Sequence, residues 1–121
     1  MPVIRLDDVP LEPFREGATY QTLVGDDAGS TPLRFGVQVS QPGYATGTHA
    51  HPYLEIVTVI EGEGEAWIEG EGGTVAIGPG TTMVFQPGVR HWFRVTGDMP
   101  MKTHGIHASP NRIIERFPDA D

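Results

Sequence analysis

Hydrophobic and polar residues alternate along several short stretches of the chain. The clearest stretch is residues 33–40, where every second position is apolar: Leu33, Phe35, Val37 and Val39. This period of two is typical of a β-strand with one buried face. Other short stretches rich in Val, Ile and Thr lie between turn signals such as Pro42-Gly43 and Pro87-Gly88. The pattern predicts strands at residues 33–39, 46–51, 53–60, 66–68, 74–77, 82–86, 91–95 and 101–107.

Seven or eight short strands at this spacing indicate a β-sandwich or β-barrel. We expect one all-β domain over residues 1–121, with its barrel core at about residues 33–108. Residues 3–6 are predicted to form a short strand, and residues 7–16 a loop or an edge. A single short helix is expected at residues 111–117, where the apolar face would consist of Ile113, Ile114 and Phe117.

The composition and net charge limit the classes of partner that this chain is expected to bind. The chain has 121 residues and a formal net charge of -8, enough for one domain with an acidic surface that repels phosphate backbones and anionic lipids. No Lys/Arg cluster offsets this charge, so neither nucleic acid nor a membrane is an expected partner. There are no cysteines, which excludes disulfides and thiolate ligands. With no signal-like apolar run at the N-terminus, we expect a cytoplasmic protein.

Three residues in the middle of the chain can do metal chemistry. His49 and His51 are two positions apart in a predicted strand, so their side chains share a face about 6.5 Å apart. Glu55 follows with the same parity and offers an anionic oxygen. Two imidazoles and a carboxylate suit a divalent metal ion, but two histidines at this spacing also occur by chance on a strand surface. Spacing alone leaves both interpretations open.

The residues around this trio resemble the cupin family. The family's first motif, G(X)5HXH(X)3–4E(X)6G, is matched at every position from Gly43 to Gly62. The second motif, G(X)5PXG(X)2H(X)3N, is matched from Gly80 to His91 except that Gln86 replaces a proline, and Val95 stands in place of the final asparagine. Neither departure falls on a ligand position of the family.

The resemblance implies a jelly-roll β-barrel in which His49, His51, Glu55 and His91 converge on one divalent transition metal ion. Iron, manganese, nickel, cobalt, copper and zinc all accept such ligands. Four protein ligands in six-coordination would leave two positions for a substrate oxygen and a second ligand such as O₂ or water.

Strand parity extends the expected pocket beyond the ligands. Val57 and Val59 follow Glu55, and Phe93 and Val95 follow His91, so they would form an apolar wall. We expect Tyr53, Val57, Phe93 and His107 to line the substrate pocket. Tyr53 either bonds the substrate or lies at the rim in water. His107 is either an acid/base group near the metal or a cap of the Ser109-Pro110 turn.

The leading functional hypothesis is a metal-dependent oxygenase, of the dioxygenase type, acting on a small organic substrate. A non-oxidative isomerase or lyase with Tyr53 or His107 as acid/base, and a non-catalytic small-ligand binder or sensor, remain as alternatives, because the fold supports all three. Small single-domain cupins resemble one another in forming homodimers. Residues predicted to point outward yet mostly apolar fit such a contact: Ile56, Thr58, Ile60 and Trp92.

Overall fold

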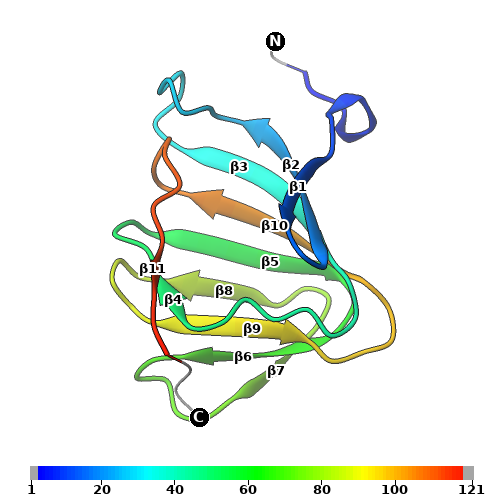
Figure 1. Ribbon diagram of the computed structural model, residues 1–121, viewed down its shortest axis with the longest axis vertical. Coiled ribbons are helices and arrows are strands. Elements are labelled where there is room, and N and C mark those ends of the chain that lie inside the picture. Colours follow the sequence, from blue (N-terminus) through cyan, green and yellow to red (C-terminus); the bar gives the residue numbers. More distant parts are fainter. Residues whose placement is uncertain (1–2, 119–121) are drawn as a thin grey trace.

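The computed structural model describes residues 3–118 as two antiparallel β-sheets (Figure 1). A short 3-10 turn, η1, spans Leu6–Asp8. The strands are β1 (Glu12–Arg15), β2 (Ala18–Val24), β3 (Arg34–Ser40), β4 (His49–Ala50), β5 (Glu55–Glu61), β6 (Gly64–Ile68), β7 (Val75–Ile77), β8 (Thr82–Phe85), β9 (His91–Val95), β10 (Met101–His107) and β11 (Glu115–Arg116). One sheet has the order β1-β2-β3-β10-β5-β8 and the other β11-β4-β9-β6-β7.

The nearly all-β prediction is confirmed, with one refinement. Within the described residues each strand pairs inside one of these two sheets, so the architecture is a two-sheet sandwich rather than one continuous closed barrel. In the same part of the chain, no helix is long and apolar enough to cross a membrane.

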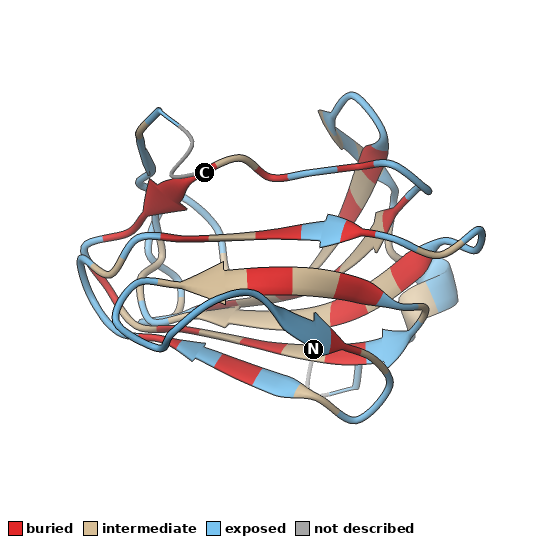
Figure 2. Cartoon of the chain, turned by 90° about the horizontal axis from the view of Figure 1, so that it is seen from below, coloured by how far each residue is buried: buried red, intermediate tan, exposed pale blue. Residues whose placement is uncertain are grey.

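Buried residues alternate with intermediate or exposed residues along several strands (Figure 2). In β5, Glu55, Val57 and Val59 are buried, whereas Ile56 and Thr58 are partly exposed. In β9, His91, Phe93 and Val95 are buried while Trp92 and Arg94 face outward. The parity predicted for these strands is therefore confirmed, and it brings both sets of inward residues between the two sheets.

An alternating strand usually directs its apolar side chains inward, but strand β3 differs. Its polar positions face inward, because Arg34 and Gln38 lie opposite His107 and Thr103 of β10. Between them, Gly36 makes room for Tyr20 of β2. A Cβ at Gly36 would come within 2.5 Å of the Tyr20 ring. The apolar residues of β3 occupy the alternate positions, where Val37 is 2% exposed and Phe35 and Val39 are partly buried.

The hydrophobic core occupies one end of the sandwich and leaves the other end polar. The core contains Val57, Val59, Phe93, Val95 and Met101, contributed by both sheets. Strands β5 and β9 begin with Glu55 and His91, and β10 ends with His107 opposite Glu55. Ionisable residues therefore cluster where these strands meet, next to the core.

Three predicted elements, two of them near the ends of the chain, differ from those in the structure. No helix forms at residues 111–117, where Ile113 and Ile114 stay exposed and β11 pairs with β4 instead. A seven-residue helix gains little by itself, whereas β11 satisfies the otherwise open edge of β4. Residues 3–6 form no strand, and the strand expected at 46–51 is reduced to His49–Ala50.

Candidate metal centre

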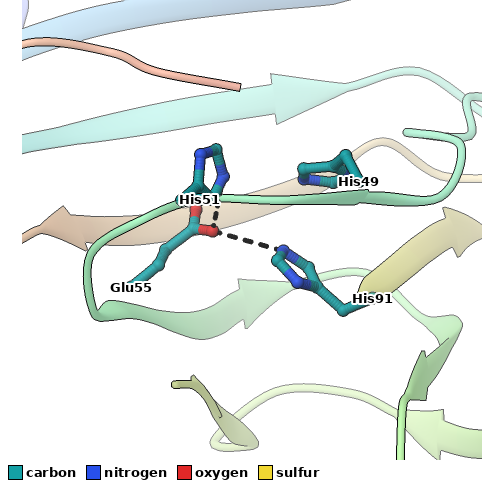
Figure 3. A group of neighbouring side chains, drawn as sticks. All are labelled: His49, His51, Glu55 and His91. Carbon is teal, nitrogen blue, oxygen red and sulfur yellow. Dashed lines mark ion pairs between the residues drawn. The ribbon is translucent and has the colours of Figure 1, made fainter. Parts of the chain in front are cut away.

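Four buried side chains converge at the polar end of the sandwich (Figure 3). His49 lies in β4, His51 directly after it, and Glu55 and His91 begin β5 and β9. One ligand atom from each of these residues lies within 4.8 Å of the others. The four residues predicted to hold a metal are thus brought together, and the group could bind a metal ion.

Backbone carbonyls orient all three imidazoles. The Nδ1 of His49 lies 2.8 Å from Gly47 O, that of His51 2.7 Å from Ile113 O, and that of His91 3.0 Å from Val89 O. A carbonyl oxygen only accepts a hydrogen bond, so each Nδ1 carries the proton. In the neutral ring, each Nε2 then presents a lone pair, as a metal ligand must.

Aromatic rings hold two of these imidazoles in place. The ring of Phe85 stacks on His91 with centroids 3.7 Å apart, and that of Tyr53 stacks on His51 at 4.9 Å. Because Phe85 and Tyr53 are themselves buried, the imidazoles have little freedom to turn. The site is preorganised in the absence of an ion.

The electronic character of the cluster fits a cation. Glu55 Oε1 lies 3.1 Å from His51 Nε2 and 3.4 Å from His91 Nε2. Nevertheless Glu55 Oε1 and His91 Nε2 are buried without a hydrogen-bond partner. Buried polar atoms without partners are costly. A divalent ion would accept these lone pairs together. Imidazole nitrogens and a carboxylate oxygen are suitable ligands for such an ion.

Burial and neighbouring groups shift the pKa values in the cluster, and the shifts of Glu55 and His49 favour metal binding. Burial alone would raise the pKa of Glu55, but its interactions with His107, His51 and His91 outweigh burial and hold that pKa well below its usual range. Burial lowers the pKa of His49 to about 4. Burial also acts to lower the pKa of His51, but its interaction with Glu55 prevails and raises it. At neutral pH Glu55 is therefore anionic and His49 neutral.

A second layer of hydrogen bonds fixes the carboxylate. His107 Nε2 lies 3.2 Å from Glu55 Oε2, and the Tyr53 hydroxyl lies 2.9 Å from His107 Nδ1. Tyr53 also accepts a bond from the backbone N–H of Ile113 at 3.4 Å. With Tyr53 donating to Nδ1, His107 donates from Nε2 to Glu55. This chain leaves Glu55 Oε1 facing the three imidazoles.

A cavity of about 550 Å³, counted together with the open space at its mouth, lies beside the four residues. Both sheets and the C-terminal segment contribute to its wall, which consists of Phe14, Arg15, Tyr20, Gln38, Tyr44, Thr46, His49, His51, Glu55, Phe93, His107, Arg112, Ile114 and Arg116.

Of the four residues predicted to line the pocket, two line the cavity and two do not. Phe93 and His107 line the cavity, whereas Val57 belongs to the hydrophobic core and Tyr53 lies behind His107. Tyr53 is only 7% exposed, so its hydroxyl is not in water at the rim. His107 does not cap the following turn either, because Ser109 Oγ itself accepts the Asn111 N–H.

Sequence reasoning missed the cavity residues that come from the ends of the chain. Phe14 and Tyr20 belong to the N-terminal hairpin of β1 and β2, and Arg112 and Arg116 to the C-terminal segment predicted as a helix. One signal is present for β2, where Ala18 and Tyr20 alternate with the polar residues Thr19 and Gln21. The cavity role of the arginines had no local signal, because it depends on tertiary contacts.

The structure is similar to solved structures of known cupins and related proteins. A polyketide cyclase, RemF, from Streptomyces resistomycificus matches with a TM-score of 0.83 and 20% identity, covering 100% of this chain and 89% of that one. A predicted oxalate decarboxylase from Thermotoga maritima matches with a TM-score of 0.75 and 24% identity, covering 87% and 96%. A cupin 2 domain-containing protein from Halorhodospira halophila gives 0.73 and 28%, covering 88% and 73%.

Sequence comparison identifies the family directly. No curated protein sequence matches this chain. The family model described as "Cupin domain" matches residues 36–107, a range that includes both motifs and all four converging residues. The chain therefore belongs to the cupin family.

Proposed function

We propose that this cupin is a metal-dependent enzyme, an oxygenase of a small organic substrate that binds in the 550 Å³ cavity. The observation that carries the proposal is the set of three Nε2 lone pairs and Glu55 Oε1, buried and facing one another beside that cavity. His49, His51, Glu55 and His91 would hold the ion. A transition metal ion there would supply Lewis acidity toward substrate oxygens and a binding position for O₂.

The chain's own residues contribute positioning more than proton transfer. Among the described cavity residues, His107 is the histidine outside the cluster, and both of its ring nitrogens are engaged by Glu55 and Tyr53. It is therefore poorly placed to take a proton from a substrate. This observation favours chemistry at the metal over acid/base chemistry by His107 or Tyr53.

A second candidate is a non-oxidative reaction such as ring closure or decarboxylation. The buried hydroxyls of Tyr20 and Tyr44 line the cavity and have no hydrogen-bond partner among the described residues, so either could donate to a substrate oxygen. Two structural neighbours carry names of this type, a polyketide cyclase and a predicted oxalate decarboxylase. At 20% and 24% identity, these neighbours support the fold and suggest no particular substrate.

O₂ uptake separates the candidates. Protein loaded with Fe, Mn, Ni, Co, Cu or Zn is assayed on diketones, thiols, flavonols and phenols, with the His49→Ala/His91→Ala double variant as control. We expect at least one redox-active metal form to consume O₂ with a substrate, and the variant to consume none. Anaerobic conversion without O₂ uptake would establish the second candidate. Saturable binding without turnover would show a binder or sensor instead.

A further inference from the structure

Three arginines stand at the mouth of the cavity. Arg15, Arg112 and Arg116 are exposed residues that also line it. Arg15 Nη1 and Arg116 Nη1 both donate to the backbone carbonyl of Thr46, at 2.6 and 3.0 Å. Each guanidinium has five N–H donors, so most of them remain available to a ligand. The cavity entrance is positive although the chain carries a net charge of -8.

The acidic groups of the cavity do not cancel this charge. Glu55 is committed to the histidine cluster through both of its oxygens. Glu12 lies 3.9 Å from Arg112 Nη1 and offsets part of that one charge. Arg15 and Arg116 face no carboxylate within ion-pair distance in the described part of the chain. An anionic ligand would meet uncompensated positive charge here.

Two buried tyrosine hydroxyls lie deeper in the same cavity. Tyr20 and Tyr44 are 5% and 6% exposed, and their hydroxyl oxygens have no hydrogen-bond partner among the described residues. An arginine lies beside each of the two rings, and a guanidinium cannot accept a hydrogen bond. Arg112 lies 4.4 Å from the Tyr20 ring centroid and Arg15 lies 6.0 Å from that of Tyr44. The hydroxyl protons therefore need an acceptor that a ligand can supply.

Two pairs of aromatic rings form the cavity walls. Phe14 and Tyr20 come from the six-stranded sheet, with centroids 5.8 Å apart. Tyr44 precedes the other sheet and lies 6.4 Å from Phe93 of β9. Flat, polarisable walls on both sides suit a planar ring more than a sugar, because a sugar's hydroxyls need many polar partners.

We propose that the cavity binds an aromatic organic acid. Its ring lies between the Phe14–Tyr20 and Tyr44–Phe93 pairs, and its carboxylate accepts hydrogen bonds from the arginine mouth and the tyrosine hydroxyls. This proposal rests on the proposed function in so far as it names the substrate class. The carboxylate-binding wall itself consists of residues outside the metal cluster, so it can be tested without metal.

The experiment measures calorimetric binding of 2-naphthoate and of neutral 2-naphthamide to the metal-free protein at pH 8 and low ionic strength. We expect naphthoate to bind about tenfold more tightly, with the preference weakening as salt is added. Arg116→Gln and Tyr44→Phe should each weaken naphthoate binding by about threefold to tenfold, the effect of one lost hydrogen bond, and weaken naphthamide binding by less, because the amide is a neutral acceptor.

Two controls make the outcome decisive. Arg94→Gln removes the same charge from the outer face, where Arg94 pairs with Glu65, and should alter neither ligand. Tyr44→Phe should keep or raise the melting temperature, because it removes a buried hydroxyl that has no partner. Equal binding of the acid and the amide, absence of naphthoate binding, or an equal effect of Arg94→Gln would overturn the proposal. Failure of the proposed function would instead appear as missing metal or turnover, with the preference for the acid intact.

Discussion

At the scale of single residues, the site depends on which ring nitrogen each histidine presents. Gly47, Val89 and Ile113 each place a carbonyl oxygen at an Nδ1 atom. The backbone of three separate segments therefore determines the tautomer of each imidazole, independently of an ion. Groups that contact these four residues, such as His107 at Glu55, would then influence the properties of a bound ion.

Acid should release the metal. Binding requires neutral imidazoles, so affinity falls as pH drops through the histidine pKa values. His51, whose pKa is raised, is protonated first, and His49 only near pH 4. Elemental analysis after dialysis at pH 7.5, 6.0 and 4.5 should show full, reduced and negligible metal content. Unchanged content at pH 4.5, or metal retained by the His49→Ala/His91→Ala variant at pH 7.5, would contradict the four-residue site.

His107 should influence metal affinity without contacting the ion. His107→Ala removes the hydrogen bond that fixes Glu55 Oε2 and leaves the Tyr53 hydroxyl without its acceptor. We expect zinc affinity, measured by competition with a chromophoric chelator, to fall by about 10- to 100-fold. His104→Ala is the matched control, because His104 lies on the same strand and packs against Phe35 on the outer face. Equal affinities of the two variants would show that His107 has no positioning role.

At the scale of elements, the C-terminal segment is part of the site. It extends from β10 to β11 and pairs with β4 (Figure 1). On the way, Ile113 gives its carbonyl to His51 and its N–H to Tyr53. Phe117 N then donates to Thr48 O at 3.0 Å. A segment predicted as an isolated helix is instead the backbone that orients one ligand.

Loosening this segment should weaken metal binding. Phe117→Pro removes the N–H that bonds Thr48 and should destabilise the β4–β11 pairing by about 1 kcal/mol, lowering both the melting temperature and zinc affinity. Phe117→Ala is the control, since it also loses the stacking of Arg90 on the ring but keeps the N–H. If the two variants have the same zinc affinity, the backbone contact does not support the site.

The parts that could be predicted from sequence are those whose signals are local. Strand parity in β5 and β9 fixed the inward side of Glu55 and His91, and the motif spacing identified the four converging residues. The ends of the chain could not be predicted in this way. The apolar residues of the C-terminal segment, Ile113, Ile114 and Phe117, fit a helical spacing. The segment forms a strand because it pairs with the free edge of β4, which is a tertiary feature. Similarly, the inward polar face of β3 follows from its contacts with Tyr20 and His107.

At the scale of the whole molecule, the outer surface of the six-stranded sheet carries apolar side chains. Ile60 and Val84 are 36% and 46% exposed, and Ile56 is partly exposed beside them. The homodimer expected from sequence remains a prediction, and this face is where we propose that a second copy of the chain binds.

Sedimentation velocity tests this association. We expect a dimer at micromolar concentration, and a monomer when Ile56→Lys and Ile60→Lys place charge on the face, because two like-charged faces repel. Glu63→Lys, which lies outside the face, controls for the change in net charge. A monomer for the unmodified chain at the same micromolar concentration would contradict the prediction.

Part of the cavity wall comes from segments of the chain that lie far in sequence from the four converging residues. The ligands occupy positions 49 to 91, whereas Phe14, Arg15, Arg112 and Arg116 lie near its two ends. Under the proposed function, part of the selectivity is therefore encoded outside the segment that would hold the ion. Exchanging the terminal segments between related cupins would be expected to change ligand preference while conserving the four converging residues, provided that the Ile113 carbonyl is retained. That modularity offers a direct route to engineered specificity.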